Sequence, residues 1–96
     1  MIVEYTMSSS NDLDELYEFL SQAAGIGTAA NIIHKIEGKI DDLPLFPKQH
    51  KVWRNSGLRY FTVSNYMVLY LIDEPSDKII IIKRIFYSHR DIDLLL

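Results

Sequence analysis

The feature that most constrains the fold is a run of four isoleucines at residues 79–82, which leads directly into a polar cluster. Isoleucine is β-branched, and the run is too short to cross a membrane, so it predicts a strand in the middle of a sheet. Residues 87–90 then place a phenol, a hydroxyl, an imidazole and a guanidinium in a row. These groups can grip or cleave a phosphate, or contact an acidic partner. The pattern therefore predicts a functional site at the end of this strand.

The length of 96 residues, with a 48% share of apolar residues, is enough for a single domain over residues 1–96 with a modest core. The absence of cysteine excludes disulfides and thiolate chemistry, and the three scattered histidines show no metal-ligand spacing. We therefore expect no metal and no cofactor. No apolar stretch reaches the length of a membrane span, and the N-terminus does not resemble a signal peptide, so we expect a cytoplasmic protein without membrane contact.

The net charge of −3 hides an uneven distribution. Residues 1–47 carry two basic and eight acidic groups, residues 48–59 carry four basic groups and none acidic, and residues 60–96 carry four basic and five acidic groups. The middle segment predicts a positive patch that can meet phosphates or an acidic protein. The alternative is a solvated loop and edge strand. The candidate binding residues of this segment are Lys48, His50, Lys51, Trp53 and Arg54.

Two amphipathic helices are predicted before the basic segment. Ser9, with Asp12 three residues later, resembles a capping box, and the acidic residues that follow suit the positive end of a helix dipole. Gly25 and Gly27 are expected to break this helix, and Thr28 is expected to cap the next one, which ends before the first proline. The two helices joined by a short glycine loop predict a helical hairpin.

The remaining segments predict strands. Residues 2–6 alternate apolar and polar side chains, which indicates a short first strand. Residues 58–63, 66–72 and 78–86 follow one another with only turn residues between them, an order that favours an antiparallel meander. The predicted fold class is therefore α+β in the order β-α-α-β-β-β, with the helical pair on one sheet face and a short apolar C-terminal tail returning to the sheet.

The order of elements, together with residues 57–73 and 79–96, resembles the RelE/ParE superfamily of small toxins from bacterial type II toxin–antitoxin modules. The ParE-like branch carries an arginine–aromatic pair, an asparagine–tyrosine turn, an isoleucine–aspartate step and a final aromatic with an arginine–aspartate pair. In this sequence those motifs are Arg59-Tyr60, Asn65-Tyr66, Ile72-Asp73, and Tyr87 with Arg90-Asp91. The resemblance implies a toxin that causes growth arrest and forms a heteromeric complex with a cognate antitoxin.

The resemblance implies two different activities. ParE-like members poison DNA gyrase, whereas RelE-like members cut messenger RNA at the ribosome without a metal, which requires a cationic cluster. The RelE-like basic pair falls on His89 and Arg90, with Arg59 as a further phosphate clamp, but the second-strand lysines and the arginine after the turn have no counterpart. The prediction is a ParE-like toxin with a protein target such as gyrase. The alternative is a RelE-like endoribonuclease that uses Arg59, His89 and Arg90.

Each candidate also has a structural interpretation. His89 can simply be solvated, Arg90 can pair with a nearby aspartate, and Arg59 can form a cross-strand salt bridge. Tyr60 and Tyr87, candidates for contact with the target or the antitoxin, can instead pack within the sheet. By the resemblance, the basic segment suits an antitoxin whose disordered end folds over the toxin. The acidic first helix is the less favoured antitoxin surface unless that partner presents arginines.

Overall fold

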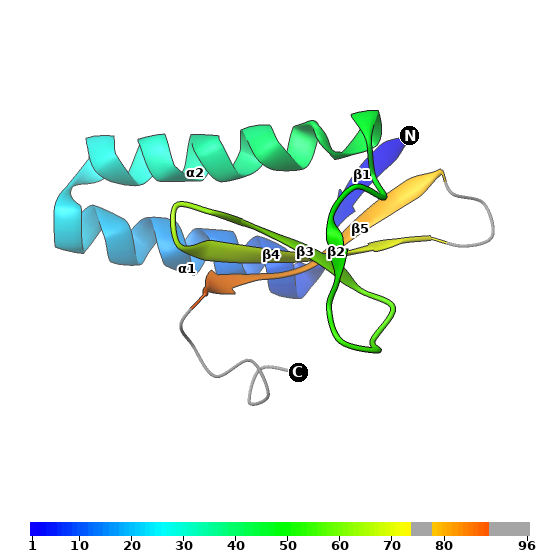
Figure 1. Ribbon diagram of the computed structural model, residues 1–96. Helices are drawn as coiled ribbons and strands as arrows, with labels where there is room; N and C mark the ends of the chain where they lie inside the picture. The colour runs from blue at the N-terminus through cyan, green and yellow to red at the C-terminus, as the bar shows by residue number, and fades with distance from the viewer. Residues whose placement is uncertain (74–77, 89–96) are drawn as a thin grey trace.

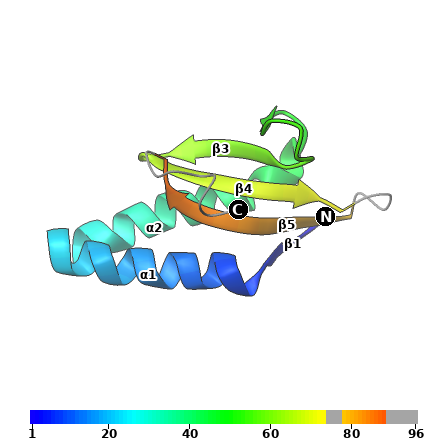
Figure 2. The same cartoon turned by 90° about the horizontal axis from the view of Figure 1, so that it is seen from below.

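The computed structural model describes residues 1–73 and 78–88, and in these residues the chain forms a five-stranded mixed sheet with two helices on one face (Figures 1 and 2). The elements are β1 (Ile2–Tyr5), α1 (Met7–Ala24), α2 (Ile26–Asp41), the short 3-10 helix η1 (Leu43–Leu45), β2 (Lys51–Val52), β3 (Arg59–Val63), β4 (Tyr66–Ile72) and β5 (Ile79–Tyr87). The predicted β-α-α-β-β-β order is confirmed, with β2 as an additional edge strand. The predicted turn at residues 74–77 and the predicted return of the tail lie outside the described residues.

The sheet has the strand order β1-β5-β4-β3-β2. β3, β4 and β5 form the predicted antiparallel meander. Ser64 and Asn65 join β3 to β4 with φ angles of 49° and 69°, the left-handed values that a two-residue hairpin turn requires. β1 instead runs parallel to β5, beginning with Ile2 opposite Ile79, so the sheet as a whole is mixed. The isoleucine run therefore lies between two strands, as its composition predicted.

α1 begins at Met7, and its N-cap is Thr6 rather than the predicted Ser9. The Thr6 Oγ1 accepts a hydrogen bond from the Ser9 backbone nitrogen at 3.0 Å and lies 3.1 Å from the carbonyl oxygens of Ile82 and Lys83, to which it donates. One hydroxyl thus caps the helix and covers the edge of β5 where β1 ends. Ser9 is buried inside the first turn, and no acidic residue lies in that turn, so the predicted capping box and dipole contacts of Asp12 are wrong.

One glycine separates the two helices. Gly25 has a φ of 94°, a conformation that side-chain-bearing residues avoid, and it ends α1 and begins α2. Gly27 and Thr28 lie within α2, so the predicted second break and the predicted threonine cap are wrong. Neither helix in the described part of the chain is long and apolar enough to span a membrane.

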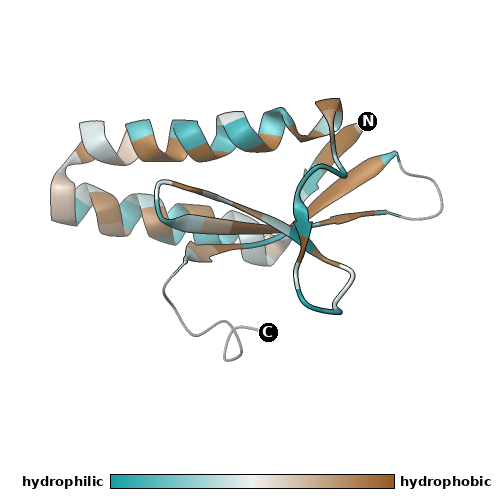
Figure 3. Ribbon diagram, viewed as in Figure 1, coloured by the Kyte–Doolittle hydropathy of each residue, from teal (hydrophilic) through white to brown (hydrophobic). Residues whose placement is uncertain are grey.

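The main core lies between the helices and one face of the sheet, where hydrophobic segments of both layers meet (Figure 3). Its buried members are Ile36, Ile40, Leu43, Phe61, Val68, Tyr70, Ile72, Ile80, Ile82 and Ile85. Leu69 and Phe86 alternate with core residues along their strands and so face away from the helices, yet they are only 0% and 4% exposed. The middle of the sheet is therefore buried on both faces.

Candidate functional site

The basic segment, residues 48–59, forms the outer edge of the sheet. It comprises β2, the start of β3 and the projecting loop between them (Figure 1). Lys51 pairs with Tyr60 across the two strands. The loop turns through two left-handed residues, Arg54 with a φ of 53° and Gly57 with a φ of 80°. The segment is thus an edge strand with an exposed loop, and its positive charge is displayed along one side of the molecule.

Arg59 holds the chain before β2 onto the sheet. Its Nη1 donates to the backbone oxygens of Lys48 at 3.2 Å and His50 at 2.7 Å. Tyr70 reinforces the same contact, because its hydroxyl donates to the Pro47 oxygen at 2.6 Å. Nη1 of Arg59 therefore already donates to two carbonyl oxygens, and this residue has a structural role. Its role as a phosphate clamp stays a prediction.

His50 contributes an aromatic contact rather than a charge to this edge. Its ring lies with its centroid 5.0 Å from that of Phe61 and 6.2 Å from that of Tyr70. Burial lowers the pKa of the imidazole, and the nearby cations Lys39 and Arg59 lower it further. An imidazole with a lowered pKa is neutral at pH 7, so His50 does not add to the positive patch.

One exposed cation of the basic segment lies against a tryptophan ring. The guanidinium carbon of Arg54 lies 4.6 Å from the centroid of the Trp53 ring, within the range of a cation–π contact. Tyr60 is half-buried and faces the other side of the sheet from Arg59. The exposed cations of the basic segment are Lys48, Lys51 and Arg54. This surface can contact an acidic protein patch, with the half-exposed indole as an apolar anchor.

The residues predicted for binding do not all gather at one place. The strand register puts Arg59 opposite Tyr70, at the start of β3, and Tyr87 opposite Tyr66, which pairs with Val63 at the end of β3. Four residues along a strand separate the two positions by about 13 Å. His89 and Arg90, which follow Tyr87, lie outside the described residues. Within the described chain, Arg59 and Tyr87 therefore belong to opposite ends of the sheet.

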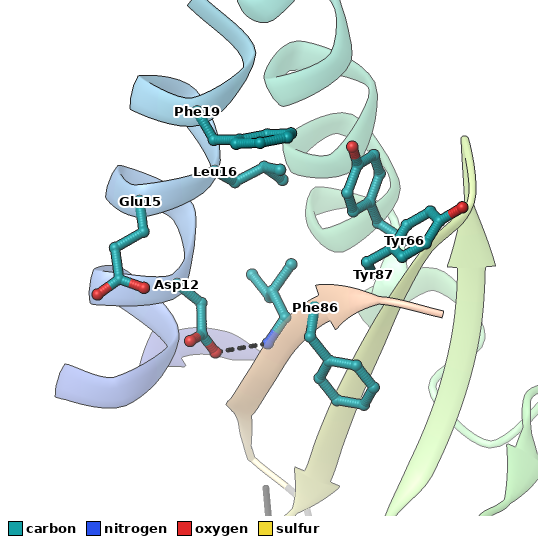
Figure 4. Close-up of a pocket in the computed structure, with 8 residues that line it drawn as sticks. Asp12, Glu15, Leu16, Phe19, Tyr66, Phe86 and Tyr87 are labelled. Atoms are coloured by element: carbon teal, nitrogen blue, oxygen red, sulfur yellow. Dashed lines mark hydrogen bonds between the residues drawn. The ribbon is translucent and has the colours of Figure 1, made fainter. Parts of the chain in front are cut away.

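A pocket that the sequence did not predict lies between α1, the start of β4 and the end of β5 (Figure 4). It has a volume of about 650 Å³ and is lined by Asp12, Glu15, Leu16, Phe19, Tyr66, Ile85, Phe86 and Tyr87. The pocket is open, since Phe19 is 65% and Tyr87 44% exposed. Phe19 is the one residue in the sequence that could have indicated the pocket. It lies outside the apolar face of the helix, but three residues after Leu16 and therefore next to that face.

The two tyrosines form one wall of this pocket. The ring centroids of Tyr66 and Tyr87 lie 5.8 Å apart, and the rings are tilted with respect to each other. Burial raises the pKa of Tyr66, and the neighbouring Tyr87 raises it further, so this phenol stays protonated at neutral pH. Paired tyrosine rings offer a rigid apolar surface with polar rims, which suits contact with another protein.

Asp12 fixes the floor of the pocket by joining α1 to β5. Its Oδ2 accepts from the Arg84 Nε at 2.8 Å and from the Ile85 backbone nitrogen at 2.9 Å, and its Oδ1 accepts from the Arg84 Nη2 at 3.1 Å. The bidentate hydrogen bond raises the pKa of the Arg84 guanidinium. Because β1 ends opposite Ile82, the carboxylate replaces a neighbouring strand for the next part of β5.

Comparison with known proteins agrees with this fold. The family described as "ParE toxin of type II toxin-antitoxin system, parDE" matches residues 3–92. A chain of the chromosomal ParDE system from P. aeruginosa is similar in structure, with a TM-score of 0.82 and 20% identity over 93% of this chain and 97% of that one. A chain of the intact E. coli RelBE toxin–antitoxin complex is also similar, with a TM-score of 0.69 and 9% identity over 93% and 98%. A chain of the RelBE2 complex from Mycobacterium tuberculosis has a TM-score of 0.60 and 22% identity over 90% and 95%.

A search of curated proteins by sequence gives no match. The structural similarities are below 25% identity and establish the fold, whereas the family match covers nearly the whole chain. The predicted membership of the RelE/ParE superfamily is confirmed, and its ParE-like branch is favoured. This chain belongs to the ParE toxin family of type II toxin–antitoxin systems.

Proposed function

We propose that this toxin arrests growth by binding a protein target, DNA gyrase, and not by cutting RNA. The main support for the proposal is the position of Arg59. Its Nη1 donates hydrogen bonds to the carbonyl oxygens of Lys48 and His50. A phosphodiester cleaved without a metal needs cations directed at the developing negative charge. Here the guanidinium that resembles the RelE-like clamp is directed at the chain's own backbone.

The face of the sheet that points away from the helices supports the same proposal. Thr62, Met67 and Phe86 lie side by side on β3, β4 and β5. By the resemblance, RelE-like toxins carry lysines on the second strand, where this chain has Arg59, Tyr60 and Thr62, and an arginine after the turn that follows it, where this chain has Met67. Thr62 and Met67 are uncharged, and the cation at these positions, Arg59, is bonded to backbone oxygens, which supports a ParE-like toxin without nuclease chemistry.

The basic segment is the surface we assign to target binding. Lys48, Lys51 and Arg54 are exposed, and Trp53 lies half-exposed under the Arg54 guanidinium. A partly apolar, cationic surface complements an acidic patch on a protein, and its aromatic and arginine side chains are the types that dominate binding energy. Neutralisation is assigned to a cognate antitoxin, since the similar chains come from ParDE and RelBE systems.

Induced expression in a bacterial host tests the proposal. We expect growth arrest with altered plasmid supercoiling or gyrase-dependent DNA breaks, while messenger RNA stays intact. Lys51→Glu should weaken the arrest because it reverses a charge in the basic segment. Lys35→Glu is the matched control, since Lys35 is exposed on α2, outside that segment.

The RelE-like alternative makes a different prediction in the same experiment. Codon-positioned RNA cuts that disappear in His89→Ala or Arg90→Ala would contradict the gyrase proposal and establish the nuclease. Intact messages in the arrested wild type, with the arrest unchanged in His89→Ala, would exclude a catalytic histidine. The absence of any arrest would contradict toxicity itself.

A further inference from the structure

The turn that precedes the basic segment displays two large apolar side chains to solvent. Leu45 ends η1 and Phe46 follows it, and the two are 70% and 67% exposed. This exposed pair borders a hollow of about 200 Å³ between the end of α2 and His50. Lys39 and Asp42 also line the hollow, and their opposite charges offset each other. The turn therefore presents an apolar surface without net charge, and adjacent exposed apolar side chains of this kind are typical of an interaction site.

The backbone of the turn is held in one conformation. The Gln49 N–H donates to the Phe46 oxygen at 3.2 Å. The next oxygen, that of Pro47, accepts from the Tyr70 hydroxyl at 2.6 Å. Pro44 and Pro47 flank the exposed pair, and proline fixes its own φ angle and restricts the residue before it. The exposed pair therefore has little backbone freedom to lose when it binds, which favours affinity.

The turn continues into the basic segment along the outer edge of the sheet (Figure 1). Lys48 comes two residues after Phe46, and Arg59 of β3 holds this stretch by donating to the oxygens of Lys48 and His50. Val52, which pairs with Arg59, is 49% exposed and extends the apolar surface onto β2. The stretch from η1 to β2 therefore displays apolar and cationic side chains side by side.

We propose that Leu45 and Phe46 anchor the toxin to its target protein by inserting into an apolar pocket whose rim carries carboxylates. The inference rests on the proposed function and adds an apolar contact to the cationic one assigned there. Rigid aromatic side chains are among those that dominate binding energy, and carboxylates at the rim complement the exposed Lys51. The anchor also gives a reason for the bonds of Arg59 and Tyr70 to backbone oxygens just after Phe46, because these bonds position the turn.

Inhibition of purified gyrase measures the contribution of the anchor. Phe46→Ala should raise the toxin concentration needed for half-inhibition about tenfold. Ile26→Ala is the matched control, because Ile26 is also 67% exposed but lies at the other end of α2 from η1, and it should leave this concentration unchanged. Urea midpoints equal to that of the wild type are expected for both exposed positions. A Phe46→Ala variant as potent as the control would overturn the inference.

Pro47→Ala tests whether the rigidity of the turn matters. The substitution keeps the oxygen to which Tyr70 donates but frees the backbone after Phe46. It should weaken inhibition about threefold. In the Phe46→Ala background it should have no further effect, because no anchor is left to position. Equal effects of Pro47→Ala in the two backgrounds would contradict a positioned anchor.

Cell growth separates this inference from the assignment of gyrase as the target. Phe46→Ala should weaken growth arrest and Ile26→Ala should not, whichever protein the toxin binds. Undiminished arrest by Phe46→Ala would overturn the anchor and leave the proposed function intact. If the wild type arrests growth but leaves purified gyrase unaffected, the gyrase assignment fails and the growth comparison decides the anchor. A wild type that causes no arrest would overturn both.

Discussion

The basic segment and the pocket beside α1 carry opposite charges, and the fold builds them in different ways. The basic segment is one uninterrupted stretch of the sequence, residues 48–59. The pocket combines residues 12–19 of α1 with the end of β5 and the start of β4, which are far apart in the sequence. A surface made of sequence neighbours is visible in the charge pattern, whereas a surface made by packing helix against strand is not.

The two regions also use their charged groups differently. Arg59 of the basic segment is turned towards backbone oxygens, and the burial of His50 keeps its ring neutral. In the pocket, Asp12 is likewise bonded to β5, whereas Glu15 is exposed and its charge acts on the nearby Arg84. The formal charge of a segment therefore exceeds the charge that it displays wherever a charged side chain is bonded within the fold.

The largest effect is expected at Asp12, which joins the pocket to the sheet. Asp12→Ala removes three hydrogen bonds and leaves the Ile85 N–H and the Arg84 guanidinium without this carboxylate, so the free energy of unfolding should fall by about 2–3 kcal/mol. Urea denaturation measures the change. Asp14→Ala, at an exposed position of the same helix, should stay within about 0.5 kcal/mol of wild type. Equal losses for the two variants would show that α1 is not held through Asp12.

A smaller effect is expected at Arg59, which holds the basic segment. Arg59→Ala should lower the free energy of unfolding by about 1–2 kcal/mol because the Lys48 and His50 oxygens lose a charged donor. Hydrogen exchange should quicken locally around β2 and be unchanged in α1. As the control, Arg54→Ala lies in the same segment but at an exposed position. If the stability of Arg59→Ala were unchanged, the guanidinium would not be needed for the fold. That result would favour its role as a phosphate clamp and the RelE-like alternative.

The smallest effect is a pH dependence from His50. The folded protein lowers the pKa of this imidazole below its ordinary value of 6.5, so the unfolded chain binds the proton more readily in the window just below that value. The contribution of the neutral His50 ring to the free energy of unfolding should therefore be fully present above pH 6.5. It should decline as the pH falls through this window. Urea midpoints measured on both sides of the window, for wild type and His50→Gln, isolate the contribution. An identical pH slope in the variant would contradict it.

Much of the architecture could be predicted, because it depends on local patterns. The isoleucine run predicted a central strand, and the period of apolar residues predicted two helices and a meander. The parallel pairing of Ile2 with Ile79 could not be predicted in the same way, since no turn links the two strands. The cap at Thr6 was missed for a related reason, because this hydroxyl is selected by the carbonyl oxygens of β5 as well as by its own helix.

The candidate site was predictable only in part. The sequence located the basic segment and the family resemblance, because both follow from contiguous residues. It did not show that Arg59 would be bonded to the chain before β2, since that contact depends on the path of the loop after η1. The sequence also did not show that Phe19 and Tyr87 border an open pocket, because that pocket forms only where α1 packs beside β4 and β5.

Purified DNA gyrase provides the most direct test of the proposed toxin activity. The wild-type protein is added to a gyrase supercoiling reaction, with Lys51→Glu and the matched Lys35→Glu in parallel. We expect inhibition or trapped DNA breaks by wild type and Lys35→Glu, and a clear loss of the effect in Lys51→Glu. A gyrase reaction that the toxin leaves unchanged, together with messenger RNA cleavage in translating ribosomes, would contradict the ParE-like mode of action.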